Sequence, residues 1–160
     1  MKKLTTMMAL FGSLFFASCG NTPNPVEYNN KLMTVMNENE KHMNAMNAAM
    51  TGEDYAKAET VRKTWSDQLG KSIGEVEKLG AIKEDGGLKT AVTDGLKGYK
   101  QIADESYKQL IELRTKEKGG DTTVQAQIQA TLDKINTSFE TIGGNINKAS
   151  DAFEKQVNKQ

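Results

Sequence analysis

Apolar residues recur at intervals of three and four positions along a proline-free run from Val26 to Gln160. This spacing places them on one face of a helix, whereas a half-buried β-strand needs an alternation of two. Proline, which ends or kinks helices, occurs only at positions 23 and 25. The chain is therefore expected to be all-α from Val26 onward.

The first two helical stretches are separated by a short turn. The first covers about 26–50 and carries an apolar stripe that Asn39 interrupts; the second covers about 54–79. The dipeptide at 51–52, Thr-Gly, ends the first helix. Glu53 or Asp54 then supplies the negative charge that a helix start favours. These signals predict an antiparallel pair.

The third and fourth stretches are also bounded by turn residues. The third covers about 87–118 and lies between KEDGG at 83–87 and KEKGG at 116–120. Glycine after basic residues is typical of a helix C-terminus. The fourth begins at Asp121 or Thr122, either of which can cap it. Its apolar stripe is the most regular: Val124, Ile128, Leu132, Ile135, Phe139, Ile142, Ile146, Ala149 and Phe153.

No stretch is apolar all round, so each must bury one stripe against the others. Short connections make consecutive helices neighbours, which predicts an up-down-up-down antiparallel four-helix bundle over 26–160. An extended helical hairpin array that completes its core by dimerising is the alternative. Internal glycines indicate close helix approach or kinks, and IGGN at 142–145 is the expected bend. The other internal glycines are Gly70, Gly74, Gly95 and Gly98.

Residues 1–18 have the organisation of an export signal. Two lysines follow the start, an apolar stretch rich in Met, Leu and Phe comes next, and small residues precede Cys19. This apolar stretch is too short for a stable membrane span. Residues 19–25, CGNTPNP, are typical of a short extended tether. We therefore expect a signal peptide at 1–18, a tether at 19–25 and a bundle domain at 26–160.

The stretch FASC at 16–19 resembles the lipobox of bacterial lipoproteins, with Phe16 where that family usually has Leu. The resemblance implies cleavage by signal peptidase II, so that Cys19 becomes the first residue. It also implies lipid attachment at Cys19, with diacylglyceryl on the sulfur and an acyl chain such as palmitate on the amine. Membrane lipid is then the first partner. The alternative is an ordinary secretory signal in which Cys19 is a bystander.

The residue after the cysteine is Gly20 and not the Asp that retains Gram-negative lipoproteins in the inner membrane. The resemblance therefore favours the outer membrane of the cell envelope, with the domain facing the periplasm or the surface. Together with EYNNKL at 27–32 and four helices, the lipobox-like start resembles an uncharacterised family of small helical bacterial surface lipoproteins. That resemblance implies no activity.

Several cofactor and ligand classes are disfavoured by composition. Basic and acidic residues balance at 21 each, without an arginine-rich stripe, so no nucleic-acid partner is expected. A four-helix haem site needs ligands on facing helices, but no Met or His follows Met50. Ferritin-like di-iron sites need two Glu-x-x-His motifs, and His42 is the only histidine. We expect no cofactor and no resident metal.

The segment KHMNAMNAAM at 41–50 leaves one exception open. Thioether and imidazole groups are good Cu(I) ligands, and either His42 with Met46, four residues apart, or Met43 with Met46, three residues apart, could share a metal on one helix face. These methionines also occupy the apolar stripe, so core packing by adaptable side chains is the expected role. Trp65 is likewise expected in the core.

No catalytic constellation is present, so we expect a protein that is not an enzyme. Acid pairs such as Glu53-Asp54, Glu84-Asp85 and Asp104-Glu105 are more typical of caps and solvated surfaces than of general acid–base catalysis. One functional hypothesis is an envelope lipoprotein with a structural or protein-interaction role, including a possible homodimer. The other is a binding module. In it, helix-one residues 33–50, with Asn39, Asn44 and Asn47 among the methionines, bind an apolar ligand, a partner helix or Cu(I).

Overall fold

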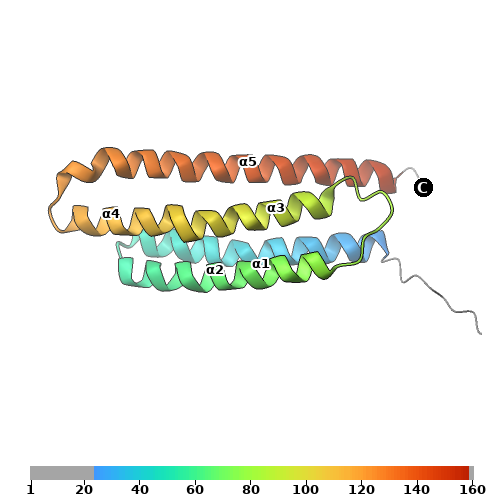
Figure 1. The fold of residues 1–160 in the computed structure, drawn as a ribbon, viewed down its shortest axis with the longest axis horizontal. Helices are drawn as coiled ribbons and strands as arrows, with labels where there is room; N and C mark the ends of the chain where they lie inside the picture. Colours follow the sequence, from blue (N-terminus) through green and yellow to red (C-terminus); the bar gives the residue numbers. More distant parts are fainter. Residues whose placement is uncertain (1–23, 159–160) are drawn as a thin grey trace, which may run out of the picture.

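The computed structural model describes residues 24–158. Residues 1–18, Cys19 and the tether up to residue 23 lie outside the described part of the chain. The described residues form four helical rods. The rods lie side by side, and the start of the first lies at the same end as the end of the last (Figure 1). The elements are α1 (Pro25–Thr51), α2 (Tyr55–Lys78), α3 (Leu88–Gln101), the π-helix η1 (Ile102–Tyr107), α4 (Lys108–Lys118), the 3-10 turn η2 (Thr122–Val124) and α5 (Gln125–Val157).

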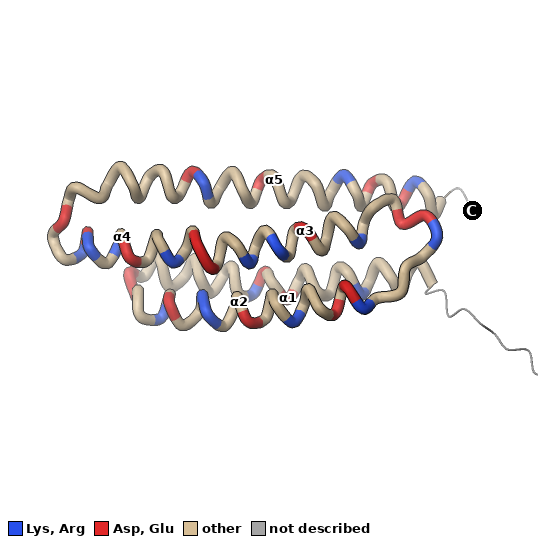
Figure 2. The backbone as a smooth tube through the Cα atoms, viewed as in Figure 1, with Lys and Arg blue, Asp and Glu red and all other residues tan. Residues whose placement is uncertain are grey.

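The predicted all-α four-helix bundle is confirmed, with α3, η1 and α4 forming one continuous third rod. Helix α1 packs on α2, α2 on α3, and α3 on α5. The core is completed within a single chain, because Tyr28, Trp65 and Leu96 from different rods are each 0% exposed. Because the core is complete, the chain does not form the alternative hairpin array. Acidic and basic residues are distributed along all the rods (Figure 2).

Apolar surface is scarce on this bundle. Among the described residues, Val26 is the only large hydrophobic residue that is mostly exposed, at 62%. In the same part of the chain, no helix combines the length and the apolar character that a membrane crossing requires.

Helix α1 begins at Pro25, one residue before the expected start. The side chain of Asn24 accepts a hydrogen bond from the backbone N–H of Val26 at 2.9 Å. Proline suits this position because its φ is fixed near the helical value and a first-turn N–H has no helical partner. Pro25 is thus the first helical residue and not part of an extended segment.

The predicted acidic cap is confirmed for α2, whereas at the start of the fourth rod Asp121 caps the 3-10 turn η2 that precedes α5. The carboxylate of Asp54 accepts from the N–H of Lys57 at 3.0 Å, and that of Asp121 accepts from the N–H of Thr123 at 3.0 Å. The KEDGG turn ends with Gly86 and Gly87, whose φ values of 62° and 82° are in the left-handed region. At Gly86 a Cβ atom would lie 2.8 Å from the backbone N of Phe153, so glycine lets this turn approach α5.

Two glycines of α3 allow close packing against α5. A Cβ atom at Gly95 would lie 2.7 Å from Cδ1 of Ile146, and one at Gly98 would lie 2.7 Å from Cδ1 of Ile142. Close approach is therefore the role of this pair. The expected bend at 142–145 is not formed as a break, because α5 is continuous from Gln125 to Val157.

Candidate functional site

The methionines of α1 contribute to packing. Met46 is 0% exposed and belongs to the central core, while the other four are half-buried and pack against it. Those four are Met33, Met36, Met43 and Met50. The expectation of core packing is confirmed for Met46. The other four methionines are partly exposed, so α1 also presents methionine side chains to solvent.

His42 is half-buried on α1, and its side chain forms no hydrogen bond with another described residue. The sulfur of Met46, four residues later, is enclosed in the core and is not accessible to solvent. The described residues contain no group of three or more His, Cys, Asp or Glu side chains placed to hold a metal ion. Both predicted Cu(I) ligand pairs, His42 with Met46 and Met43 with Met46, therefore lack an accessible Met46 sulfur, and His42 and Met43 are adjacent on the helix and do not face each other.

Asn39 does not interrupt the core, contrary to expectation. It is 0% exposed, and its Oδ1 accepts a hydrogen bond from Nε1 of Trp65 at 3.2 Å. Its Nδ2 donates to the backbone oxygen of Val35 at 2.7 Å. Because both polar groups are satisfied, the amide is tolerated in the interior. Trp65, itself 0% exposed, is a core residue as predicted.

An aromatic cluster surrounds Trp65 at the level of the π-helix. The ring of Trp65 lies 6.5 Å from that of Tyr99 and 6.0 Å from that of Tyr107, measured between centroids. Tyr99 in turn lies 5.4 Å from Phe139 of α5. Burial raises the pKa of both tyrosines, so their hydroxyls stay protonated. This cluster joins α2, the third rod and α5.

A buried arginine links α2 to the π-helix. Arg62 is 8% exposed and donates two hydrogen bonds of 2.7 Å to the carboxylate of Glu59. Its Nη1 donates to the backbone oxygen of Ala103 at 3.4 Å and lies 3.6 Å from Asp104. The guanidinium thus also satisfies a carbonyl of the π-helix, where the normal helical ladder is interrupted. The arrangement fixes two helices and leaves no free group for chemistry.

This ion pair predicts a specific acid sensitivity. The two hydrogen bonds from Arg62 lower the pKa of Glu59 from 4.5 to about 2. Because the folded pKa is the lower one, the pair stabilises the fold fully above about pH 4.5 and loses this contribution as the pH falls to about 2. In Glu59→Gln the free energy of unfolding should decline less steeply across this window, as measured by urea unfolding. Exposed Glu40→Gln is the control, and identical slopes for wild type and Glu59→Gln would contradict the assignment.

In each of the three acid pairs noted in the sequence, the aspartate forms a contact that supports the fold. Asp54 caps α2, and Asp104 pairs with Lys100. Asp85 accepts a hydrogen bond from the hydroxyl of Tyr28 at 2.9 Å and one from the N–H of Gly87 at 2.9 Å. The loop between α2 and α3 is thereby tied to the start of α1.

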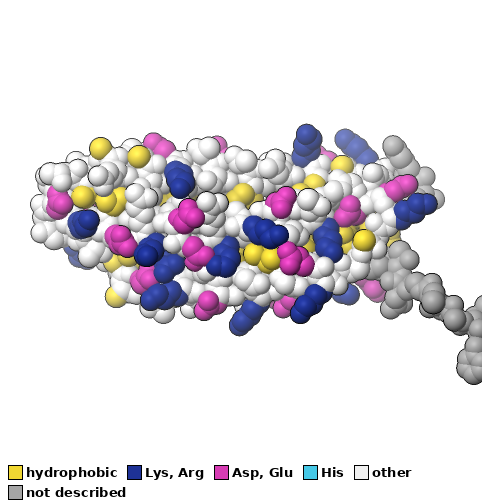
Figure 3. Space-filling model, viewed as in Figure 1, with side chains coloured by type: hydrophobic (Ala, Val, Ile, Leu, Met, Phe, Trp, Pro, Cys, Tyr) yellow, Lys and Arg dark blue, Asp and Glu magenta, His cyan; other side chains and the backbone are white. Residues whose placement is uncertain are grey.

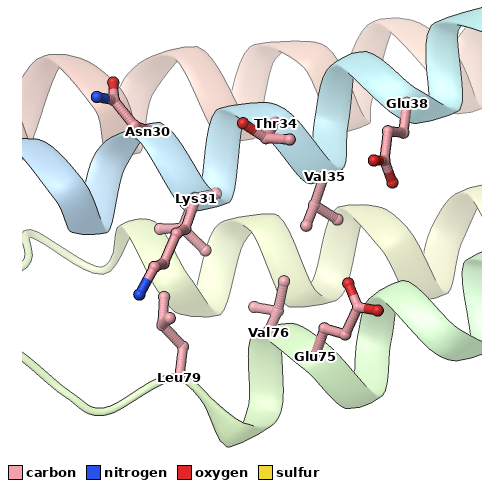
Figure 4. A pocket seen from close by; sticks show the side chains of 9 residues that line it. Asn30, Lys31, Thr34, Val35, Glu38, Glu75, Val76 and Leu79 are labelled. Atoms are coloured by element: carbon pink, nitrogen blue, oxygen red, sulfur yellow. The ribbon is translucent and has the colours of Figure 1, made fainter.

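One surface groove lies between α1 and α2, toward the start of α1. The space-filling view shows small apolar areas set among charged side chains along the bundle (Figure 3). In this groove Val35, Val76 and Leu79 lie between the charged side chains of Lys31 and Glu75 (Figure 4). Its volume is about 400 Å³. The aliphatic floor is narrow, and no unsatisfied polar atom identified in the described residues lines it.

A second groove, which we call the distal groove, lies at the other end of α1 and includes part of the predicted Met-rich segment. It has a volume of about 430 Å³ and is formed by α1, the start of α2, η1, α4 and α5. Four of its lining residues are apolar: Met50, Leu110, Leu132 and Ile135. The other seven are polar or amphipathic: Asn47, Thr51, Glu53, Tyr55, Tyr107, Arg114 and Asn136.

The charges in the distal groove already have partners. Arg114 donates to Glu117 at 2.8 Å, and Glu53 lies 3.5 Å from Lys118. The side chains of Asn47 and Asn136 and the hydroxyl of Tyr107 form no hydrogen bond with another described residue. Tyr107 is only 6% exposed. The groove therefore offers neutral donors and acceptors rather than a net charge.

The sequence indicated only part of this site. Asn47 and Met50 belong to the segment singled out as unusual. Arg114 and Asn136 carry no local signal, because they line a groove only once α4 and α5 are placed beside α1. Cys19, the predicted lipid attachment site, lies outside the described residues.

Comparisons with protein-family models, with curated proteins and with solved structures found no match for this chain.

Proposed function

We propose that this chain is a non-catalytic lipoprotein of the bacterial cell envelope, anchored by lipid at Cys19 and carrying a helical bundle for a structural or protein-interaction role. The observation that carries the proposal is the order of the N-terminal sequence: lysines, an apolar stretch, FASC at 16–19 and a short polar tether. Two or three acyl chains give durable anchoring where one chain is marginal. Gly20 favours the outer membrane as the location.

The bundle geometry is compatible with such an anchor. Cys19 precedes Pro25, the first helical residue, by six positions, which span at most about 20 Å when fully extended. The start of α1, the α2–α3 loop and the end of α5 lie at one end of the bundle (Figure 1). In the proposed lipoprotein this end stays near the membrane. The opposite end is available to another envelope component or to a second copy.

Removal of the lipid attachment site tests the proposal. In Cys19→Ser, incorporation of labelled palmitate should be abolished and the protein should leave the membrane fraction, because the acylated sulfur is lost. Inhibition of signal peptidase II should leave residues 1–18 attached. The control is Ser18→Ala, which keeps a small residue before the cysteine and should label normally. Unchanged acyl labelling of Cys19→Ser would contradict the proposal.

A second candidate function is a binding module, and the observation that favours it is the distal groove. Asn47 and Met50, at the end of the predicted Met-rich segment, line this groove together with residues of three other rods. Only one of the five methionines of α1 reaches it, so the binding surface differs from the Met-rich face that was first expected.

A further inference from the structure

We infer that α1 carries an oxidation site: peroxides convert Met33, Met36, Met43 and Met50 to methionine sulfoxide, and the sulfoxides separate α1 from α5. We call the space between the two helices, which these four residues border, the α1–α5 seam. All methionines of the described chain lie on α1, and none follows Met50 in the sequence. The inference goes beyond the proposed anchor and does not depend on lipid attachment at Cys19.

The spacing of the four methionines places them on the side of α1 that faces α5. Met50 lines the distal groove together with two apolar residues of α5. Seven residues make about two helical turns, so Met36 and Met43 lie on nearly the same side of the helix as Met50. Met33 lies one turn before Met36 on this edge. The groove on the α2 side of α1 is lined by Val35, and no methionine is among its lining residues.

The α1–α5 seam is wider than the other interfaces between neighbouring rods. In the described part of the chain, the backbone of α1 comes close to α2 and at a few positions to α3, but to α5 at isolated positions at most. Near one end, Tyr28 of α1 bridges the seam, with its ring centroid 6.3 Å from that of Phe153. Between this contact and the distal groove, Met36 and Met43 pack against the core. Long, unbranched thioether side chains suit such a space because they adapt to irregular gaps.

Exposure separates these four methionines from the fifth. Met33, Met36, Met43 and Met50 are half-buried, whereas Met46 is 0% exposed. Part of each seam side chain meets solvent, so an oxidant as small as hydrogen peroxide can approach it. Met46 is protected unless the fold opens locally. It therefore provides an internal reference on the same helix.

The reaction with hydrogen peroxide needs no other reagent. A lone pair of the sulfur attacks one peroxide oxygen, an S–O bond forms and the O–O bond breaks. The second oxygen leaves as hydroxide, which takes the proton of the first and becomes water. The sulfur is oxidised by two electrons and the peroxide is reduced. The product is a polar sulfoxide at a position that packs against the apolar core, and such a group costs free energy unless the seam opens to water.

Treatment of the full-length chain with hydrogen peroxide, followed by digestion and mass spectrometry, tests the site. We expect each of the four seam methionines to gain one oxygen at an initial rate at least about ten times that of Met46. The unfolding temperature Tm should then fall by about 5 °C or more. Amide hydrogen exchange should become faster in α1 than in α3, because α1 is the helix that loses a packed side.

Leucine variants separate oxidation at the seam from other effects of peroxide. Replacing the four seam methionines together with leucine removes the thioethers and keeps apolar side chains of similar volume. Peroxide should leave the Tm of this fourfold variant unchanged. Met46→Leu is the matched control and should lose as much Tm on treatment as the wild type. If the fourfold variant does not fold, Met36→Leu with Met43→Leu replaces it and should lose less Tm than Met46→Leu.

Three results would overturn the inference. The first is oxidation of Met46 as fast as that of the four seam methionines. The second is formation of the four sulfoxides without any change in Tm or in the hydrogen exchange of α1. The third is a loss of Tm in the leucine variants equal to that in Met46→Leu. A failure of acyl labelling at Cys19 would contradict only the proposed anchor.

Discussion

Replacing Trp65 with Ala is expected to lower the free energy of unfolding by about 3–5 kcal/mol, the cost typical of truncating a large buried aromatic side chain. Trp65 is 0% exposed and lies between Tyr99 and Tyr107. Its loss also removes the donor to buried Asn39. Domains of this size are stable by only about 5–15 kcal/mol, so this variant should be close to unfolding at room temperature.

Two further variants separate packing from hydrogen bonding at this position. Trp65→Phe keeps most of the ring but leaves the Oδ1 of Asn39 unpaired, which should cost about 1–3 kcal/mol. Adding Asn39→Leu should recover part of that loss, because both polar partners are then gone. Urea unfolding followed by circular dichroism measures all three, with exposed Lys63→Ala as the control. A change below about 0.5 kcal/mol in Trp65→Ala would contradict the described core.

Gly95→Leu should destabilise the bundle by about 1–3 kcal/mol, because added volume in a filled interface forces the surrounding groups to move. Even a Cβ atom at this position would lie 2.7 Å from Ile146 Cδ1 and 3.1 Å from Ile142 Cγ2. A leucine would therefore push α3 away from α5. The gain of about 1 kcal/mol in helix propensity on replacing glycine offsets only part of this cost.

Gly144→Ala is the matched comparison for Gly95→Leu. Gly144 lies in the interior of α5, and a Cβ atom there would meet nothing within 4 Å. Its replacement should raise the free energy of unfolding by about 0.5–1 kcal/mol through helix propensity alone. Thermal unfolding of both variants gives the comparison. Stabilisation by Gly95→Leu would show that α3 and α5 do not approach as closely as described.

The helices and their ends were accessible from the sequence because their signals are local. The three- and four-residue spacing of apolar positions marks the buried stripe of α5, and Asp54 and Asp121 act as caps within three residues of the groups they bind. Turns rich in glycine separate the rods. Such features need no knowledge of tertiary contacts, which explains why the fold class was predictable.

The interior polar contacts were not predictable, because they join residues far apart in the chain. Asn39 was interpreted as a break in the stripe of α1, but it bonds to Trp65, 26 residues away. The π-helix at Ile102–Tyr107 was not expected either, and one of its carbonyl groups is bonded by Arg62 of α2. Propensity and spacing carry no information about such partners.

The candidate site was likewise predictable only in part from the sequence. Asn47 and Met50 were recognised as unusual on a helix that otherwise packs into the core, but the groove that they line needs Arg114 and Asn136 from α4 and α5. The distal groove is therefore a product of the bundle. By contrast, the proposed anchor rests wholly on residues 1–19, and its test is chemical.

Intact mass spectrometry of the full-length chain, expressed in a Gram-negative host and purified from membranes, tests the proposed lipoprotein most directly. We expect one polypeptide that begins at Cys19 and carries a diacylglyceryl group on the sulfur and an acyl chain on the amine. A polypeptide that retains residues 1–18, or one with an unmodified Cys19 thiol, would contradict the account.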